Sequence, residues 1–165
     1  MNNGTGNTIK ALVLDIDGVL TDGTVEVQGP FRKRIFLRDL DALTLIKKKG
    51  IQMAFLTGDD EAAAGPVVER CGGASQVVYQ AKDKEAGIRE IARKLNISLD
   101  EICYVADARR DVPALKLVGL AMCPADGDRL AKQAAHVVLQ ACGGRGVVSE
   151  AVDLILERCG MEEDG

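Results

Sequence analysis

Short hydrophobic runs alternate with longer amphipathic segments along most of the chain. The hydrophobic runs are almost continuously apolar, which is typical of strands covered on both faces of a parallel sheet. They predict strands at residues 9–15, 51–56, 76–79, 102–106, 119–122 and 136–139. The amphipathic segments predict helices at residues 40–49, 60–71, 83–95, 109–118, 126–134 and 146–158. This alternation indicates a three-layer, Rossmann-like α/β fold with a parallel sheet between two layers of helices.

One segment interrupts the alternation. Residues 24–37, TVEVQGPFRKRIFL, have the pattern of two short strands around a turn at Gln28-Gly29-Pro30. They predict a β-hairpin that projects from the main sheet. The apolar face of this hairpin has two interpretations: it covers the protein's own sheet, or it is buried against another chain. The residues of that face are Val25, Val27, Ile35 and Leu37.

Length and composition fit one cytoplasmic domain. The chain has 165 residues, and we expect the domain to span residues 9–159, between a disordered N-terminus at 1–8 and a frayed acidic tail at 160–165. The net charge of −4 and the aromatic content of 3% argue against nucleic-acid binding. No apolar run reaches the length that would cross a membrane, so we expect no membrane partner.

The cysteine and histidine content limits the chemistry further. Five cysteines occur without a CxxC pair, and we interpret them as reduced thiols of a protein in the cytoplasm. His136 is the only histidine, which argues against a zinc site and against a Ser-His-Asp triad.

Polar side chains follow several of the predicted strands, where an open α/β sheet binds its ligands. A single aspartate at such a place is commonly a turn former or a helix cap. Here the set shares one edge: Asp15 and Asp17, then Thr57, Gly58, Asp59 and Asp60, then Lys84, then Asp107 and Asp111. Carboxylates gathered on one edge repel each other unless a cation lies among them. With oxygen donors only, the set favours Mg²⁺, and with a lysine and a hydroxyl it suits a phosphoryl group.

These residues resemble the haloacid dehalogenase superfamily of phosphatases with an aspartate nucleophile. DIDGVLTDG, residues 15–23, is similar to the first motif of that family, DxDGxxTD, and FLTGD, residues 55–59, is similar to the second. Lys84 matches the third motif, and VADARRD, residues 105–111, resembles the acidic fourth.

The resemblance implies a role for each residue. Asp15 is the expected nucleophile, which forms an aspartyl-phosphate, and Asp17 is the expected general acid and base. Thr57, Gly58 and Lys84 are expected to bind the phosphoryl group. The Mg²⁺ ligands are expected to be Asp15, the backbone carbonyl of Asp17, and Asp107. Asp111 is expected to support the loop or a metal-bound water, and Gly18 to allow a sharp turn around the phosphate.

The segments between the motifs are short, so the chain resembles a capless subgroup that contains the 3-deoxy-D-manno-octulosonate 8-phosphate phosphatases. FLRDLDAL, residues 36–43, and GGRGVVSEAVDLIL, residues 143–156, are similar to further segments of that subgroup. This resemblance implies a homotetramer in which a neighbour's hairpin closes the site. It also implies that Arg145 contacts a small phosphorylated sugar-acid substrate.

The second and fourth motifs depart from the family pattern. Asp59 stands where the octulosonate phosphatases have arginine, and an acid here is more similar to the nine-carbon sugar-acid phosphatases. We therefore expect Asp59 to contact the substrate. In the fourth motif, Ala106 and Ala108 replace Gly and Asp, while Arg109 and Arg110 replace neutral residues.

These departures leave alternatives open. The first interpretation is a Mg²⁺-dependent sugar-acid phosphatase. A second is the phosphatase-like delta subunit of phenylphosphate carboxylase, which would handle an aryl phosphate beside other carboxylase subunits. A third, from another class, is a non-catalytic receiver-like signalling domain. A receiver carries its phospho-acceptor at the end of the third strand, where this chain has Tyr79.

Overall fold

The computed structural model describes residues 8–29 and 32–161, and these residues form a six-stranded sheet in which all pairs are parallel. The strand order is β3-β2-β1-β4-β5-β6. The bounds are β1 Ala11–Leu14, β2 Gln52–Leu56, β3 Gln76–Val78, β4 Ile102–Val105, β5 Leu120–Cys123 and β6 Val137–Val138. The predicted strands are therefore confirmed, each with ends that differ by a few residues at most.

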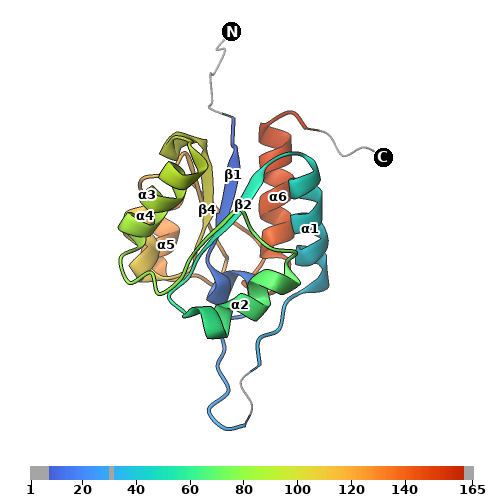
Figure 1. The fold of residues 1–165 in the computed structure, drawn as a ribbon, viewed down its shortest axis with the longest axis vertical. Helices are drawn as coiled ribbons and strands as arrows, with labels where there is room; N and C mark the ends of the chain where they lie inside the picture. Colours follow the sequence, from blue (N-terminus) through green and yellow to red (C-terminus); the bar gives the residue numbers. More distant parts are fainter. Residues whose placement is uncertain (1–7, 30–31, 162–165) are drawn as a thin grey trace.

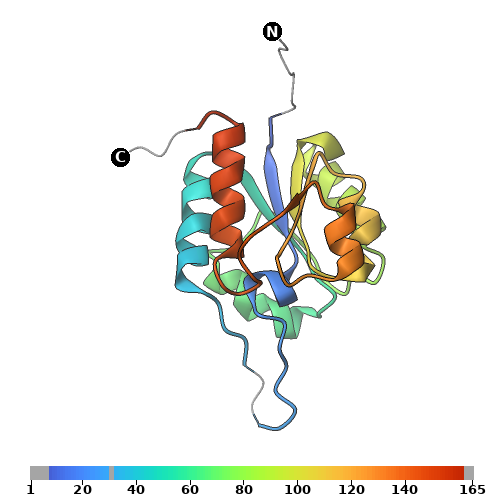
Figure 2. The same cartoon turned by 180° about the vertical axis from the view of Figure 1, so that it is seen from behind.

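Helices cover both faces of the sheet (Figures 1 and 2). One face carries α1 (Leu37–Lys48), α2 (Glu61–Arg70) and α6 (Val147–Arg158). The other carries α3 (Lys84–Leu95), α4 (Val112–Leu115) and α5 (Arg129–Ala134). The short turns η1 (Ile16–Leu20), η2 (Leu99–Glu101) and η3 (Arg109–Asp111) lie at strand ends. Within the described ranges, none of these helices is long and apolar enough to span a membrane.

The central strand β1 shows how the sequence divides between the two cores. Leu12 and Leu14 point toward α1, α2 and α6, whereas Ala11 and Val13 point toward α3, α4 and α5. Successive side chains of a strand face opposite sides of a sheet, and burial of both faces removes apolar surface from water on each. All four residues are fully buried, which explains the continuous apolar run.

The predicted helix at 109–118 is divided in the structure. Residues Arg109–Asp111 form the 3-10 turn η3, and α4 is only four residues long. Pro113 lies in the first turn of α4, where a backbone N–H has no acceptor within the helix, so the lack of an N–H costs nothing there. In the interior of a longer helix, proline would remove a hydrogen bond and clash with the preceding turn, so the helix cannot begin much earlier. The change matters because η3 carries Asp111 into the site.

The segment after η1 projects from the domain, as predicted, but as an extended loop (Figure 1). Its described residues, 21–29 and 32–36, contain no strand, so the pairing of a β-hairpin is not found there. Val25 is 69% exposed and Val27 is 93% exposed. An isolated two-stranded ribbon is marginal in water, and here Val25 and Val27 are not buried to stabilise it, although Ile35 packs partly against the core. Among the described residues, only η1, this loop and α1 lie between β1 and β2, which leaves no cap domain there.

A buried carboxylate joins α1 to α6. Asp39 accepts a hydrogen bond from the Ser149 N–H at 2.9 Å and another from the Gly146 N–H at 3.3 Å. These amides belong to the first turn of α6, whose own cap, Gly146, has no side chain. A negative charge at a helix N-terminus satisfies free N–H groups and complements the helix dipole. Asp39 therefore sets the position of α6 and of the glycine-rich segment before it.

The cysteines are free thiols, as predicted. Burial raises the pKa of the Cys71 thiol to about 11 and that of Cys123 to about 12. These thiols are therefore neutral core groups. The predicted tails lie mostly outside the described residues, and the domain bounds of 9–159 stay a prediction.

Candidate active site

A polar cavity of about 230 Å³ lies at the carboxyl ends of β1, β2 and β4. The strand order changes direction around β1, and such a point is where open α/β sheets bind ligands. Most of the predicted site residues line this cavity. Its walls are Asp15, Asp17, Gly23, Thr57, Gly58, Asp59, Lys84, Asp107, Ala108 and Arg110.

The turn after β1 places Asp15 at the floor of the cavity. Asp15 is 7% exposed, and one of its carboxylate oxygens accepts a hydrogen bond from the Ile16 N–H at 2.8 Å. Gly18 has φ +82°, a left-handed conformation that favours glycine. A Cβ atom built on Gly18 would lie 2.0 Å from the Oδ2 atom of Asp107. The glycine of the first motif therefore lets the turn approach the carboxylate that follows β4.

Lys84 is a buried cation between two of the carboxylates. Its Nζ atom lies 3.2 Å from Asp15 Oδ2 and 3.1 Å from Asp111 Oδ1, and it donates to the Leu56 carbonyl at 2.9 Å. Lys84 is the first residue of α3, where the helix dipole disfavours a positive charge. The two carboxylates and the carbonyl oxygen compensate for that position and for the burial of the ammonium group.

Asp111 is a buried residue with several polar partners, rather than an exposed residue of a helix surface. Its carboxylate accepts a hydrogen bond from the Tyr104 hydroxyl at 2.9 Å and another from the Ala108 N–H at 3.1 Å. Tyr104 is fully buried in β4, and burial raises the pKa of its hydroxyl well above the usual value, so it is a neutral donor. The sequence did not indicate that Tyr104 supports the site, because a tyrosine within an apolar strand cannot be distinguished from an ordinary core residue by its hydropathy.

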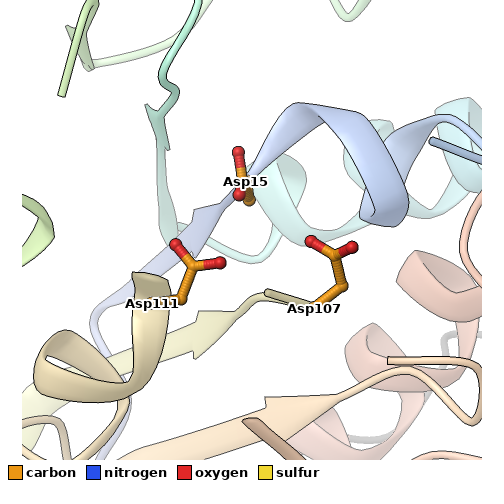
Figure 3. Close-up of side chains that lie close together, drawn as sticks. All are labelled: Asp15, Asp107 and Asp111. Atoms are coloured by element: carbon orange, nitrogen blue, oxygen red, sulfur yellow. The ribbon is translucent and has the colours of Figure 1, made fainter. Parts of the chain in front are cut away.

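Asp15, Asp107 and Asp111 form a group that fits a metal ion (Figure 3). One ligand atom from each residue lies within 4.8 Å of the others. Burial, partly offset by Lys84, raises the pKa of Asp15 to about 7, and burial together with Asp111 raises the pKa of Asp107 to about 6. A divalent cation among the three would relieve both the desolvation and the mutual repulsion. Because every donor is a carboxylate oxygen, the group suits Mg²⁺.

Asp17 contacts residues of the projecting loop and lies outside the group formed by Asp15, Asp107 and Asp111. Its Oδ1 accepts a hydrogen bond from the Thr21 hydroxyl at 2.9 Å, and its Oδ2 lies 2.6 Å from the Nζ atom of Lys33. Lys33 also pairs with Asp59. The lysine side chain is only 8% exposed, although it comes from the loop. The hydropathic pattern did not single out Lys33, because one lysine in the basic stretch RKR has no distinguishing local signal.

The second motif presents a hydroxyl and an open backbone. Thr57 is buried, and its Oγ1 atom accepts a hydrogen bond from the Asp59 N–H at 3.2 Å. The hydroxyl proton of Thr57 is therefore available to a ligand in the cavity. Gly58 is exposed at the same wall.

Arg145 does not line this cavity but a different one. That cavity has a volume of about 280 Å³, and its walls are Asp22, Arg34, Ile35, Phe36, Gly144 and Arg145. The glycine-rich segment does pack against the first motif, because the Gly144 N–H donates to the Val19 carbonyl at 2.8 Å. A Cβ atom on Gly143 would lie 2.0 Å from the Gly18 carbonyl oxygen. The glycines therefore bring this segment beside the active site and place Arg145 near the base of the projecting loop.

Comparisons with known proteins agree with this geometry. Residues 35–119 match the family of haloacid dehalogenase-like hydrolases. The 3-deoxy-D-manno-octulosonate 8-phosphate phosphatase of Escherichia coli K12 is 32% identical over 152 residues, which cover 90% of this chain and 79% of that enzyme. The enzyme of the same name from Salmonella typhi is 34% identical, with the same coverage.

Two solved structures are similar in fold over almost the whole chain. The cobalt-bound deoxy-D-mannose-octulosonate 8-phosphate phosphatase of Haemophilus influenzae has a TM-score of 0.86 and 28% identity, and the match covers 93% of this chain and 90% of that one. The 3-deoxy-D-manno-octulosonate 8-phosphate phosphatase of Moraxella catarrhalis, in complex with magnesium, phosphate and a KDO molecule, has a TM-score of 0.85 and 27% identity, with coverage of 92% and 88%.

The chain belongs to the haloacid dehalogenase-like hydrolases. Within that class it is a phosphatase, a phosphoric monoester hydrolase, and its cofactor is Mg²⁺. The two alternatives, a carboxylase subunit and a receiver-like domain, receive no support from these relatives.

Proposed function

We propose that this phosphatase hydrolyses the phosphomonoester of a small sugar acid through an aspartyl-phosphate formed on Asp15. The observation that carries the proposal is the position of the Asp15 carboxylate, at the floor of the cavity and beside the buried ammonium group of Lys84. The choice of substrate is supported by the octulosonate phosphatases among the relatives.

In the first half of the reaction, an oxygen of Asp15 attacks phosphorus and the bond to the leaving oxygen breaks. Asp17 donates a proton to the leaving oxygen, so the sugar acid departs as a neutral alcohol at that position. In the second half, a water attacks the aspartyl-phosphate while Asp17 accepts the proton of that water. The bond between phosphorus and Asp15 breaks, and inorganic phosphate leaves.

The walls of the cavity bind and orient the phosphoryl group. The Thr57 hydroxyl, the Gly58 N–H and the Lys84 ammonium group donate to its oxygens. Asp15, Asp107 and the backbone carbonyl of Asp17 would hold Mg²⁺, and Asp111 would support this group through its contact with Lys84. When bound, Mg²⁺ polarises a phosphoryl oxygen and offsets the charge that develops on it.

The pairing of Lys33 with Asp59 accounts for a sugar-acid substrate despite the acidic residue at the cavity wall. An isolated carboxylate at position 59 would repel the carboxylate of a sugar acid. The ammonium group of Lys33, which also pairs with Asp17, offsets that charge and leaves Asp59 as an acceptor for substrate hydroxyl groups.

The test compares substrates that differ in their second anionic group. We expect kcat/KM to be about tenfold to a hundredfold higher for octulosonate 8-phosphate or a nine-carbon sugar-acid phosphate than for glucose 6-phosphate, the scale of one charge-assisted contact. Asp15→Asn removes turnover of every substrate, while Asp41→Asn, an exposed change on α1, retains it. A preference for glucose 6-phosphate would refute the sugar-acid assignment, and an active Asp15→Asn variant would refute the mechanism.

We also propose that the enzyme is a homotetramer in the cytoplasm, in which the projecting loop of one subunit covers the site of another and Arg145 contacts substrate. The exposed Val25 and Val27 support a covered loop, and the free thiols support a reducing compartment. Light scattering should give a tetramer, and Arg145→Ala should raise KM for the sugar-acid phosphate about tenfold. A fully active monomer would overturn the assembly.

A further inference from the structure

A second cation lines the catalytic cavity and has no part in the roles above. Arg110 belongs to η3 and is an exposed residue of the cavity wall, which it shares with the buried Lys84. Its neighbour in sequence, Asp111, is anchored by Tyr104, by the Ala108 N–H and by Lys84. The backbone that carries Arg110 is therefore fixed relative to the floor of the cavity.

The guanidinium group of Arg110 lies against the second motif. A Cβ atom built on Gly58 would be 3.3 Å from the Nη1 atom of Arg110. The bare Cα of Gly58 thus lets the guanidinium group approach the turn that follows the Thr57 hydroxyl. Burial by itself would raise the pKa of Asp59, but Lys33 and, to a smaller extent, Arg110 lower it below its usual value.

Neighbouring contacts distinguish Arg110 from Arg109. Arg109 is not among the residues that line the cavity, and its Nη2 atom lies 3.8 Å from the carboxylate of Asp128. Arg110 forms no hydrogen bond or ion pair with any residue in the part of the chain that the structure describes. Its donors are therefore available to a ligand in the cavity.

The other cation of the site is already engaged. Lys84 directs its ammonium group at Asp15, Asp111 and the Leu56 carbonyl, so it chiefly compensates charges of the protein itself. A phosphoryl group carries negative charge on several oxygens, and a guanidinium group binds two such oxygens through a planar fork.

We propose that Arg110 binds the phosphoryl group of the substrate, directly above the turn formed by Thr57 and Gly58. This inference rests on the proposed function, because it takes the phosphoryl group to lie on that turn. In this arrangement Arg110 places a positive charge at the exposed part of the cavity, and Lys84 places one at its buried part. The proposal also gives a role to Arg110, which replaces a neutral residue of the fourth motif in this chain.

The experiment measures phosphate binding as well as turnover. Inorganic phosphate is titrated calorimetrically into the Mg²⁺-loaded enzyme, and its inhibition constant is measured against p-nitrophenyl phosphate. We expect Arg110→Ala to raise the Kd and Ki of phosphate, and the KM of p-nitrophenyl phosphate, by about tenfold to a hundredfold. Arg110→Lys should recover part of the loss, because it restores the charge without the fork.

Arg109→Ala is the matched control, since it removes the same charge from the adjacent residue and leaves the cavity wall intact. Its phosphate Kd should stay within about twofold of the wild-type value, and Tm should show that both variants are folded. An unchanged phosphate Kd in Arg110→Ala overturns the proposal. A rise in KM for a sugar-acid phosphate alone also overturns it, because the guanidinium group would then contact the carboxylate of the substrate.

The calorimetric arm separates this inference from the proposed function. A wild-type protein that binds phosphate through Arg110 but does not turn over sugar-acid phosphates would refute only the substrate assignment. A sugar-acid phosphatase whose phosphate affinity is unaffected by Arg110→Ala would refute only the role of Arg110.

Discussion

Replacement of Gly18 by alanine tests whether the turn after β1 and the carboxylate after β4 act as one unit. Gly18 has φ +82°, and the added Cβ atom would lie 2.0 Å from Asp107 Oδ2. Such Cβ contacts do not occur below 3.0 Å, so the carboxylate of Asp107 must retreat by about 1 Å or the turn must open.

Two effects of this substitution have different sizes. The left-handed conformation costs about 1–2 kcal/mol with a Cβ atom present, which lowers stability. The displacement of Asp107 misplaces a proposed metal ligand relative to the nucleophile. A misplacement of about 1 Å in a catalytic centre costs on the order of a hundredfold in rate. We therefore expect kcat/KM for p-nitrophenyl phosphate to fall about a hundredfold and the concentration of Mg²⁺ for half-maximal activity to rise.

Gly50→Ala provides the control for backbone strain. Gly50 has φ +81°, almost the same as Gly18, but a Cβ atom there would meet nothing within 4 Å. In thermal unfolding without Mg²⁺, Gly50→Ala should show the cost of backbone strain alone, and Gly18→Ala should lose at least as much stability. Only Gly18→Ala should lose activity and Mg²⁺ affinity. Equal kinetics in the two variants would show that the close approach of Gly18 to Asp107 has no catalytic meaning.

Three further predictions concern stability, pH and the loop. Asp39→Ala should destabilise the fold by about 2–4 kcal/mol and lower Tm by roughly 10 °C, because it leaves buried N–H groups at the start of α6 without an acceptor. The control, Asp41→Ala at an exposed position of α1, should change Tm little, and equal Tm shifts in the two variants would contradict the capping role of Asp39. The pKa of Asp15 in the folded protein is raised to about 7, so the metal-free fold should lose stability as pH rises from about 4 to 7. Mg²⁺ binds the ionised carboxylate, so the apparent Mg²⁺ affinity should increase from pH 6 to pH 8. Calorimetric Mg²⁺ titrations that show no pH dependence would argue against the raised pKa. Lys33→Met should raise KM for a sugar-acid phosphate about tenfold, because the charges of Asp17 and Asp59 would no longer be offset. Arg32→Met, at an exposed position, is the control, and equal KM values for the two variants would show that Lys33 does not shield the substrate from these carboxylates.

The layers of the fold and the edge of the sheet that bears the chemistry could be predicted from the sequence. Strand and helix periodicities are local properties, so the alternation of apolar runs and amphipathic segments was sufficient to predict the parallel sheet. The carboxyl ends of parallel strands share one edge, and for that reason Asp15, Thr57 and Asp107 were expected to meet although they are far apart in the chain. The structure places all three on one cavity.

The partners of those residues could not be predicted and became visible in the folded chain. Tyr104 supports Asp111, Lys33 pairs with Asp17 and Asp59, and Asp39 caps α6, and none of these contacts has a local signal. The hydropathic pattern also predicted a paired hairpin at 24–37, since alternation in sequence cannot show whether a partner surface exists to bury the apolar face. Long-range contacts of this kind depend on where distant segments meet, which is set by packing of the whole chain rather than by the residues of one element.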